Sequence, residues 1–359
     1  MHAKRILWAS MCGLCGLLAL GGQALAQDLG DGRGIDHVAL LVRPENFEAA
    51  VDVFADQLGF SATPALLSPL GAKNSLIWFN DLSYLEIATF TELNEFTAPF
   101  LAFLEDHEGG KFYGTDVVDA AQAITFLTGA GYSNIGPIPA PPLTIESTGE
   151  IVGLSPLWSS IILLSPLAPD NSNFFLDYDE AQVQQMFTEF PALAPQPHPN
   201  TAQKIDTLWL VVADLDAAIA FYEGLGLEVR FKHKKVHYLG ARGAEVRYNN
   251  NTLALLEPDG PGLVADFAAD RGEGIMGMSI QAGNLQTARA LINSNTGLAL
   301  QTFKYKGPGP LPDPGLPDPR LPDRDGRVVP PPRGCPTGRH SCGGRILHCR
   351  IDPCRLSPT

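Results

Sequence analysis

Residues 35–60 read IDHVALLVRPENFEAAVDVFADQLGF, and they contain the transition that decides the fold. The apolar run from Ile35 to Val42 is typical of a buried strand. Beyond Pro44, apolar residues recur at helical spacing until a glycine ends the segment. These positions are Phe47, Val51, Phe54, Leu58 and the closing Gly59. The stretch therefore predicts a strand, a helix and a stop.

Two further runs complete this first unit. Residues 74–79 and 83–90 are rich in β-branched and aromatic residues, and Asn80-Asp81 between them is a turn signal. They predict a hairpin after the helix; these runs account for three strands of the unit, to which we assign the order βαβββ.

The same order recurs along the chain. A strand at 208–212, a helix capped by Asp214 and a strand at 253–256 form a second clear copy. Weaker copies span 111–178 and 274–303, the latter with a strand at 274–282, a helix at 284–293 and a strand at 298–303. We therefore expect an α+β protein of four paired units, with one domain at 27–190, a Pro-rich linker at 191–203 and a second domain at 204–306.

The first 26 residues have the pattern of an export signal. Lys4 and Arg5 precede an apolar run at 6–20, and Ala24-Leu25-Ala26 is a small-x-small cleavage pattern. A membrane anchor and a lipid-modified Cys15 are the alternatives, but the apolar run is shorter than the ~20 residues that span a bilayer. We expect an exported protein, periplasmic or secreted, without a membrane segment once the signal is cleaved.

Residues 307–359 differ in composition from the rest. They contain 13 Pro, 8 Gly and 8 Arg, and no Ala, Glu or Lys. One interpretation is a Pro-rich tail closed by a disulfide or zinc knot at its four cysteines; the preferred one is a shifted reading frame of a GC-rich gene. The fourth unit would then be incomplete, which predicts an exposed sheet edge and an unstable chain.

The charge argues against nucleic acid as a partner. The chain has 39 acidic and 25 basic residues, for a net charge of −14, and the stretch 27–306 alone has 34 acidic against 15 basic. Phosphate backbones are bound mainly through Lys and Arg. The sequence also has no phosphate-binding loop, no His-Glu-x-x-His helix and no Gly-x-Ser-x-Gly turn.

The quoted segments resemble a known superfamily. The stretches IDHVA at 35–39, LGF at 58–60, ADLDAA at 213–218, FY at 221–222 and LGL at 225–227 are similar to the vicinal oxygen chelate superfamily, which includes glyoxalase I, extradiol dioxygenases and bleomycin-resistance proteins. GAKN at 71–74 and YLEI at 84–87 bring the first unit nearest to glyoxalase-like domains. The resemblance implies two cup-shaped mixed sheets, each built from two paired units.

The resemblance also implies a divalent metal, Fe, Mn, Ni or Zn, inside the first cup, on His37 and Glu86. Alternate strand residues share a face, so Glu86 lies with Tyr84 rather than with Leu85. Tyr84, Phe112 and Asn74 are the candidate substrate-binding residues. A third ligand is open among Asp177, Asp179, His107 and Glu108. The alternative is a hydrogen-bonded His37 in a polar cup, with Glu86 as its partner or as the partner of an arginine.

The second half departs from this pattern. Thr207, Ala254 and Gly277 stand at the ligand positions, which favours a scaffold or an apolar pocket lined by Trp209, Phe231 and Tyr238. His233 and His237 are expected in a solvated basic loop.

Three functions remain open at this point. The first is recognition of a small oxygen-bearing organic molecule, with metal-dependent lyase, isomerase or dioxygenase chemistry if the protein is an enzyme. The second is metal-free sequestration, as in bleomycin-resistance proteins, and the third is an interaction module. The sequence does not indicate the oligomeric state.

Overall fold

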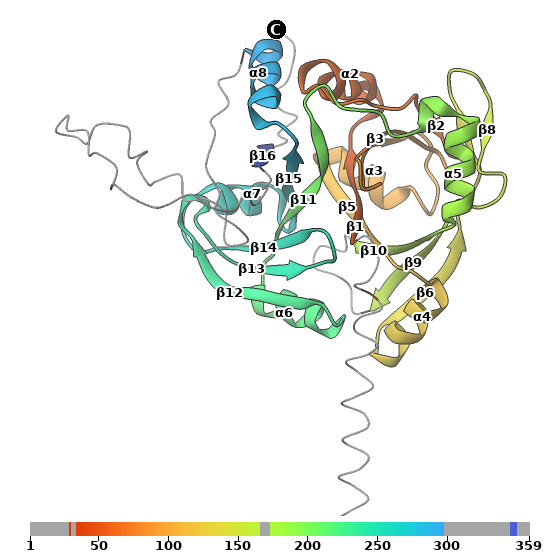
Figure 1. Cartoon of the computed structure of the whole chain (residues 1–359). Coiled ribbons are helices and arrows are strands. Elements are labelled where there is room, and N and C mark those ends of the chain that lie inside the picture. The colour runs from red at the N-terminus through yellow and green to blue at the C-terminus, as the bar shows by residue number, and fades with distance from the viewer. Residues whose placement is uncertain (1–28, 30–33, 166–172, 298–344, 350–359) are drawn as a thin grey trace, which may run out of the picture.

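The computed structural model describes residue 29, residues 34–165 and 173–297, and the backbone of 345–349 (Figure 1). The expected export signal, the expected strand at 298–303 and the rest of the tail lie outside these residues.

The first half of the chain contains ten strands. They are β1 (Ile35–Leu41), β2 (Leu66–Leu67), β3 (Ala72–Trp78), β4 (Tyr84–Phe90), β5 (Gly109–Asp116), β6 (Ser133–Pro139), β7 (Leu143–Ile145), β8 (Ile151–Val152), β9 (Trp158–Ser165) and β10 (Asn173–Tyr178). The helices are α2 (Phe47–Asp52), which continues into a π-turn at Val53–Gln57, α3 (Ala98–Asp106), α4 (Ala120–Gly129) and α5 (Glu180–Glu189). Short 3-10 turns occupy Pro44–Asn46 and Pro191–Leu193.

These strands form one mixed sheet in the order β6-β9-β10-β5-β1-β4-β3-β2-β7-β8. At its centre β1 pairs in parallel with β4 and antiparallel with β5, so that His37 lies opposite Tyr84 on one side and Gly114 on the other. Because β1 and β4 are adjacent, alternate residues of both strands reach the same face of the sheet.

The second half contains a six-stranded sheet in the order β12-β13-β14-β11-β15-β16. Its strands are β11 (Ala202–Val211), β12 (Glu228–Val236), β13 (Ala241–Arg247), β14 (Thr252–Pro258), β15 (Gly274–Ala282) and β16 (Arg345–Cys349), and its helices are α6 (Leu215–Gly224), α7 (Leu263–Arg271) and α8 (Leu285–Thr296). A 3-10 turn at His237–Leu239 joins β12 to β13. Strand β16 comes from the compositionally distinct tail and pairs antiparallel with β15, so this edge of the sheet is covered and not exposed as expected.

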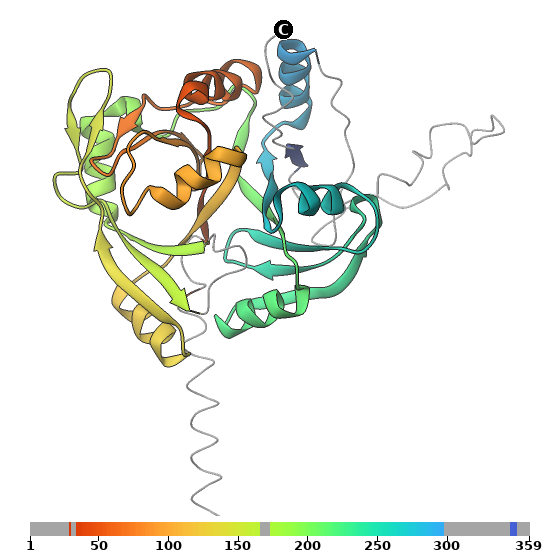
Figure 2. The same ribbon diagram turned by 180° about the vertical axis from the view of Figure 1, so that it is seen from behind.

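Helices lie over the inner face of each sheet, α3 and α5 on the first and α7 on the second (Figures 1 and 2). Phe100 and Leu104 of α3 pack against Leu41, Ala88 and Phe90 of the first sheet. In the second half, α7 covers apolar residues of β11 and β14. The cluster beneath it includes Trp209, Val211, Ala254, Leu256 and Val264 of α7 itself. No helix in the described part of the chain is long and apolar enough to cross a membrane.

The two halves are joined through buried polar contacts as well as a shared apolar core. The hydroxyl groups of Tyr113 and Tyr222 lie 2.6 Å apart, across 109 positions of sequence. Asn251 accepts the backbone N–H of Ile35 on its Oδ1 at 2.8 Å and donates from Nδ2 to the carbonyl of the same residue at 3.3 Å. A buried backbone group without a partner is costly, so Asn251 stabilises the first strand of the other half.

Asn251→Ala should lower the free energy of unfolding by about 1 to 3 kcal/mol, because the N–H and C=O of Ile35 lose these partners in a buried position. Urea unfolding monitored by circular dichroism measures the change. The control is Asn250→Ala, whose side chain is exposed. Equal stabilities of the two variants would show that the contact at Ile35 contributes nothing.

The α+β fold class with two mixed sheets is confirmed, and strands β1, β3, β4, β5 and β15 lie close to their expected positions. Helices α3, α5 and α7 were not expected from the repeat. The basic segment was also placed wrongly: His233 belongs to edge strand β12, not to a loop, although it is exposed as expected and pairs with Asp216 at 3.2 Å. Lysine-rich edges of this kind discourage pairing with other chains.

Candidate functional site

His37 lies at the centre of the first sheet, on β1, and is 3% exposed. Its Nδ1 is 2.7 Å from Oδ2 of Asp36, the preceding residue. Adjacent strand residues normally face opposite ways, but the pairing of β1 with β5 has a bulge between Ile35 and His37 that breaks this alternation. Since a carboxylate accepts only, the hydrogen on this bond belongs to Nδ1, and the ring is held in one orientation.

The same oxygen of Asp36 accepts a second hydrogen bond. Tyr178 on β10 donates its hydroxyl to Asp36 Oδ2 at 2.9 Å and lies 3.3 Å from the hydroxyl of Tyr84. Burial, followed by the charge of Asp36, raises the pKa of Tyr178 well above its ordinary value, so the phenol stays a donor. Asp36, itself fully buried, thus links β1 to β10 beneath the site.

Glu86 and Asn74 form the rest of the polar base. Glu86 Oε2 lies 3.7 Å from His37 Nε2, and its Oε1 accepts a hydrogen bond from Asn74 Nδ2 at 2.9 Å. The Glu86 side chain is 14% exposed. Burial raises the pKa of Glu86, while His37 and the Asn74 hydrogen bond oppose the rise. The predicted proximity of His37, Glu86, Tyr84 and Asn74 is therefore present in the structure.

Aromatic side chains surround this base. Tyr84 stacks on the His37 ring with centroids 4.6 Å apart. The Phe112 and Phe174 rings lie at steep angles to the same ring, with centroids 6.2 Å and 5.5 Å from its centre. Both phenylalanines are half-buried, as are Asn74 and Glu86. The site therefore has a polar base with aromatic side chains around it.

The residues present do not fit the divalent metal that the resemblance implies. A catalytic metal ordinarily has three protein ligands, and the structure brings together two candidates, His37 and Glu86. Among the described residues no cluster of three or more His, Cys, Asp or Glu side chains could hold a metal ion. Phe112 on β5 and Phe174 on β10 lie beside the His37 ring instead of further ligands.

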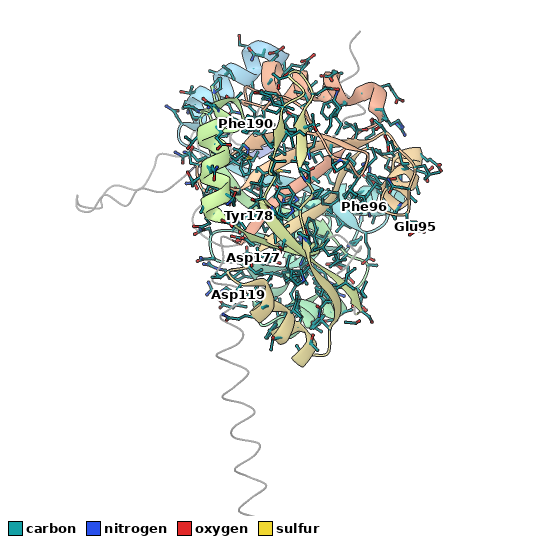
Figure 3. All side chains as sticks on the ribbon, turned by 90° about the vertical axis from the view of Figure 1, so that its right-hand side faces the viewer. Glu95, Phe96, Asp119, Asp177, Tyr178 and Phe190 are labelled. Atoms are coloured by element: carbon teal, nitrogen blue, oxygen red, sulfur yellow. The ribbon has the colours of Figure 1, made fainter. Side chains whose placement is uncertain are left out.

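The four other candidate ligands have structural roles elsewhere. Asp177 Oδ2 accepts the backbone N–H of Ala120 at the start of α4 (Figure 3). Asp179 caps α5 by accepting from Gln182 at 3.0 Å. These are ordinary helix-capping bonds, in which a carboxylate satisfies a free backbone N–H.

His107 and Glu108 also point to other partners. His107 ends α3 and contacts the ring of Phe103. Glu108 accepts the backbone N–H of Arg43 at 2.7 Å and the side-chain amide of Asn46 at 2.9 Å. Neither residue extends the polar base of the cup.

The second half has no comparable site among the described residues. Trp209 donates from Nε1 to Ser279 Oγ at 3.2 Å and is 8% exposed beneath α7, near Tyr238. Phe231, by contrast, is 41% exposed on β12, with Lys234 over its ring. Of the two alternatives for this half, a scaffold or a pocket lined by these three aromatic residues, the pocket is not formed, because α7 covers Trp209 and Phe231 lies on the outer strand. Glu257 forms an ion pair with Arg242.

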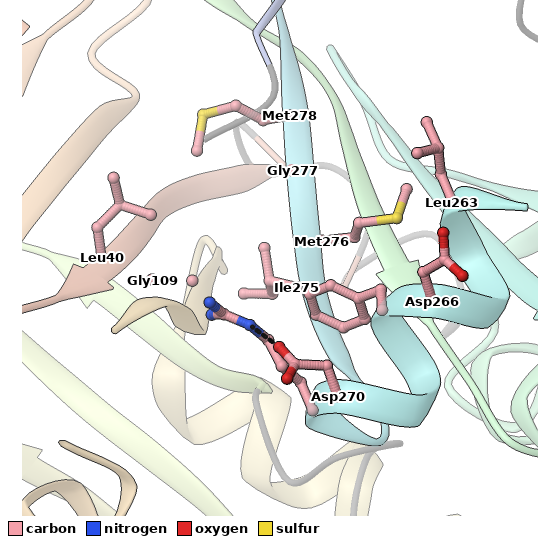
Figure 4. A pocket seen from close by; sticks show the side chains of 12 residues that line it. Leu40, Gly109, Leu263, Asp266, Asp270, Ile275, Met276, Gly277 and Met278 are labelled. Atoms are coloured by element: carbon pink, nitrogen blue, oxygen red, sulfur yellow. Dashed lines mark ion pairs between the residues drawn. The ribbon is translucent and has the colours of Figure 1, made fainter. Parts of the chain in front are cut away.

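A hollow of about 240 Å³ lies between the halves, beside α7 and β15 (Figure 4). Met276 and Phe267 supply apolar surface. Arg271 pairs with Asp270 at 3.4 Å and donates to the backbone carbonyl of Glu108, so its charge is already engaged at the junction. This hollow is separate from the polar cup around His37.

Glu86→Gln should change the pH dependence of stability. Between the ordinary and the raised pKa of Glu86 the folded chain keeps a proton that the unfolded chain has lost, so the contribution of Glu86 falls as pH rises through this window. Glutamine does not titrate. The stability of the variant relative to the parent should therefore increase as the pH rises from the ordinary pKa of Glu86 to its raised pKa, and should stay level outside this window.

Urea unfolding at several pH values measures this difference. His37 and Asp36, the other titratable groups that act on Glu86, are present in both proteins. The control is Glu45→Gln, an exposed residue before α2. A difference between Glu86→Gln and the parent that stays constant across the pH range would contradict the prediction.

The fold and this cup define a protein of the vicinal oxygen chelate class, and the comparisons agree. The glyoxalase-like domain family matches residues 35–226, more than half of the chain, so the chain belongs to that family. The glyoxalase, bleomycin resistance protein and dioxygenase superfamily matches residues 204–295. Such domains bind small molecules, and many members use a divalent metal.

Solved structures give more distant similarities. A triple mutant of 4-hydroxymandelate synthase from Streptomyces coelicolor is 16% identical, with 74% of this chain and 76% of that chain covered and a TM-score of 0.49. A hypothetical protein from Staphylococcus aureus is 12% identical, with 62% and 85% covered and a TM-score of 0.45. Comparison with curated proteins gave no match.

Proposed function

We propose that this chain is an exported protein that binds a small organic molecule in its first cup without a metal. The observation that carries the proposal is the combination of a two-residue ligand set, His37 and Glu86, with Phe112 and Phe174 beside the His37 ring instead of further ligands. A polar base with aromatic walls is a common arrangement for recognition of small molecules.

Metal-assisted lyase, isomerase or dioxygenase chemistry is the competing function, and metal analysis separates the two. The full chain is equilibrated with Fe²⁺, Mn²⁺, Ni²⁺ and Zn²⁺, dialysed, and analysed by mass spectrometry beside His37→Ala. We expect far less than one metal ion per chain, with no difference between the proteins. The control is His233→Ala on the exposed edge strand.

Near-stoichiometric metal in the parent that is lost in His37→Ala and kept in His233→Ala would overturn the metal-free proposal. Small-molecule binding is tested on the same samples through tryptophan fluorescence. Trp78 packs against Tyr84 with ring centroids 4.5 Å apart, so a ligand over the cup should change its emission.

A further inference from the structure

Two oxygen atoms at the base of the first cup are open to a further donor. His37 directs its Nδ1 at Asp36, and its Nε2 faces Glu86. That nitrogen is 3.7 Å from Glu86 Oε2, which is too long for a hydrogen bond between them. Asn74 directs its Nδ2 to Glu86, and its Oδ1 is buried with no hydrogen-bond partner in the described part of the chain. Glu86 Oε2 and Asn74 Oδ1 therefore remain open to a donor on a ligand.

The base also has an excess of negative charge. Asp36 and Glu86 are both carboxylic acids in a buried environment, and the His37 imidazole is the only basic side chain that forms an ion pair with Glu86 among the described residues. Lys73, on the neighbouring strand, is bound instead to Glu48 and Glu146. A buried carboxylate without a full positive partner is costly, and a cationic ligand would offset that cost.

The walls favour the same kind of ligand. Tyr84, Phe112 and Phe174 lie around the His37 ring, and the faces of aromatic rings attract cations through their quadrupole. Resting on the proposed function, we infer that the first cup binds a protonated primary or secondary amine that carries a small apolar or aromatic group. The ammonium donates to Glu86 Oε2 and to the unpaired acceptors, and the apolar group packs against the phenylalanines.

Neutral and anionic ligands match the hydrogen-bonding groups and the charge of this base less well than an ammonium group does. A hydroxyl group donates one hydrogen bond and leaves the charge of Glu86 uncompensated, whereas an ammonium supplies up to three donors and a positive charge. A carboxylate would add a third acidic group beside Asp36 and Glu86, and two of these like charges already share one buried site.

Calorimetric titration of the full chain with three probes of similar size tests the inference. The probes are 2-phenylethylamine, 2-phenylethanol and 3-phenylpropanoate, at neutral pH. We expect the amine to bind at least about tenfold more tightly than the alcohol, and the carboxylate to bind most weakly. Glu86→Gln should weaken amine binding by roughly 10- to 100-fold and change alcohol binding by less than about twofold.

The matched control is Glu245→Gln on β13, which replaces another half-buried carboxyl group whose pKa is raised by burial. It should leave all three affinities unchanged. Equal binding of amine and alcohol, or tighter binding of the carboxylate, would overturn the amine inference while leaving small-molecule binding in place. Binding of none of the three probes would overturn both. If Glu86→Gln fails to fold, the comparison of the three probes on the parent chain still tests the amine inference.

Discussion

Asp36→Ala is expected to lower the free energy of unfolding by about 3 kcal/mol, one of the largest effects of any single substitution near the cup. Asp36 is fully buried and accepts hydrogen bonds from His37 at 2.7 Å and from Tyr178 at 2.9 Å. Alanine removes the acceptor that the buried His37 and the half-buried Tyr178 share. The cost is therefore the desolvation of two polar groups as well as the lost bonds.

Urea unfolding of Asp36→Ala measures this loss, with Asp106→Asn at the exposed end of α3 as the control, expected within about 0.5 kcal/mol of the parent. Nitrogen NMR gives a second readout. In the parent, the His37 proton should reside on Nδ1, and in Asp36→Ala this preference should disappear. A variant that loses less than about 1 kcal/mol and keeps the Nδ1 proton would show that Asp36 does not orient the ring.

The sequence was most informative where the hydrophobic pattern of each strand agrees with the pairing of neighbouring strands in the sheet. β1 and β4 are short apolar runs with clear turn signals, and their proximity in the sheet brings His37 close to Glu86 and Asn74. Strand alternation alone was enough to predict that Glu86 and Tyr84 share a face. The part of the site that depends on regular strand geometry could therefore be predicted.

The contact of Asp36 with His37 could not be predicted, because it depends on a bulge that reverses the expected alternation. Asp177 and Asp179 looked like free carboxylates, since a sequence does not show which backbone N–H groups they cap. Helix α7 carries a detectable signal: Val264, Phe267 and Ala268 have helical spacing between Gly262 and Gly272. The repeated βαβββ unit has no helix at this position. The pocket that the sequence suggested for the second half therefore did not take α7 into account.

Gly114 provides space for the His37 ring. It lies directly opposite His37 in the pairing of β1 with β5. A Cβ at this position would lie 2.8 Å from His37 Cε1, 2.9 Å from its Nδ1 and 2.8 Å from Leu176 Cδ1. Leu176 has a flexible end that can turn away, but the His37 ring is held by Asp36 and by its stack on Tyr84. A larger residue here must displace the ring.

Gly114→Ala should therefore destabilise the chain by about 1 to 3 kcal/mol, which is typical of overpacking in a well-packed core. It should also weaken ligand binding, because the ring that forms the base of the cup is displaced. The control is Gly129→Ala at the end of α4, where a Cβ meets nothing within 4 Å. That change should be neutral or stabilising by up to about 1 kcal/mol, since alanine favours helix more than glycine does.

A double-mutant cycle shows which contact causes the loss of stability in Gly114→Ala. If the His37 ring is the obstacle, Gly114→Ala should cost much less in a His37→Ala background than in the parent, with an interaction energy of roughly 1 to 2 kcal/mol. Urea unfolding of the four proteins measures it. Additive effects would instead locate the strain at Leu176 or in the strand itself. The close approach of Gly114 to His37 would then have no bearing on the site. A measured coupling would mean that Gly114 on β5 supplies the space that the His37 ring occupies.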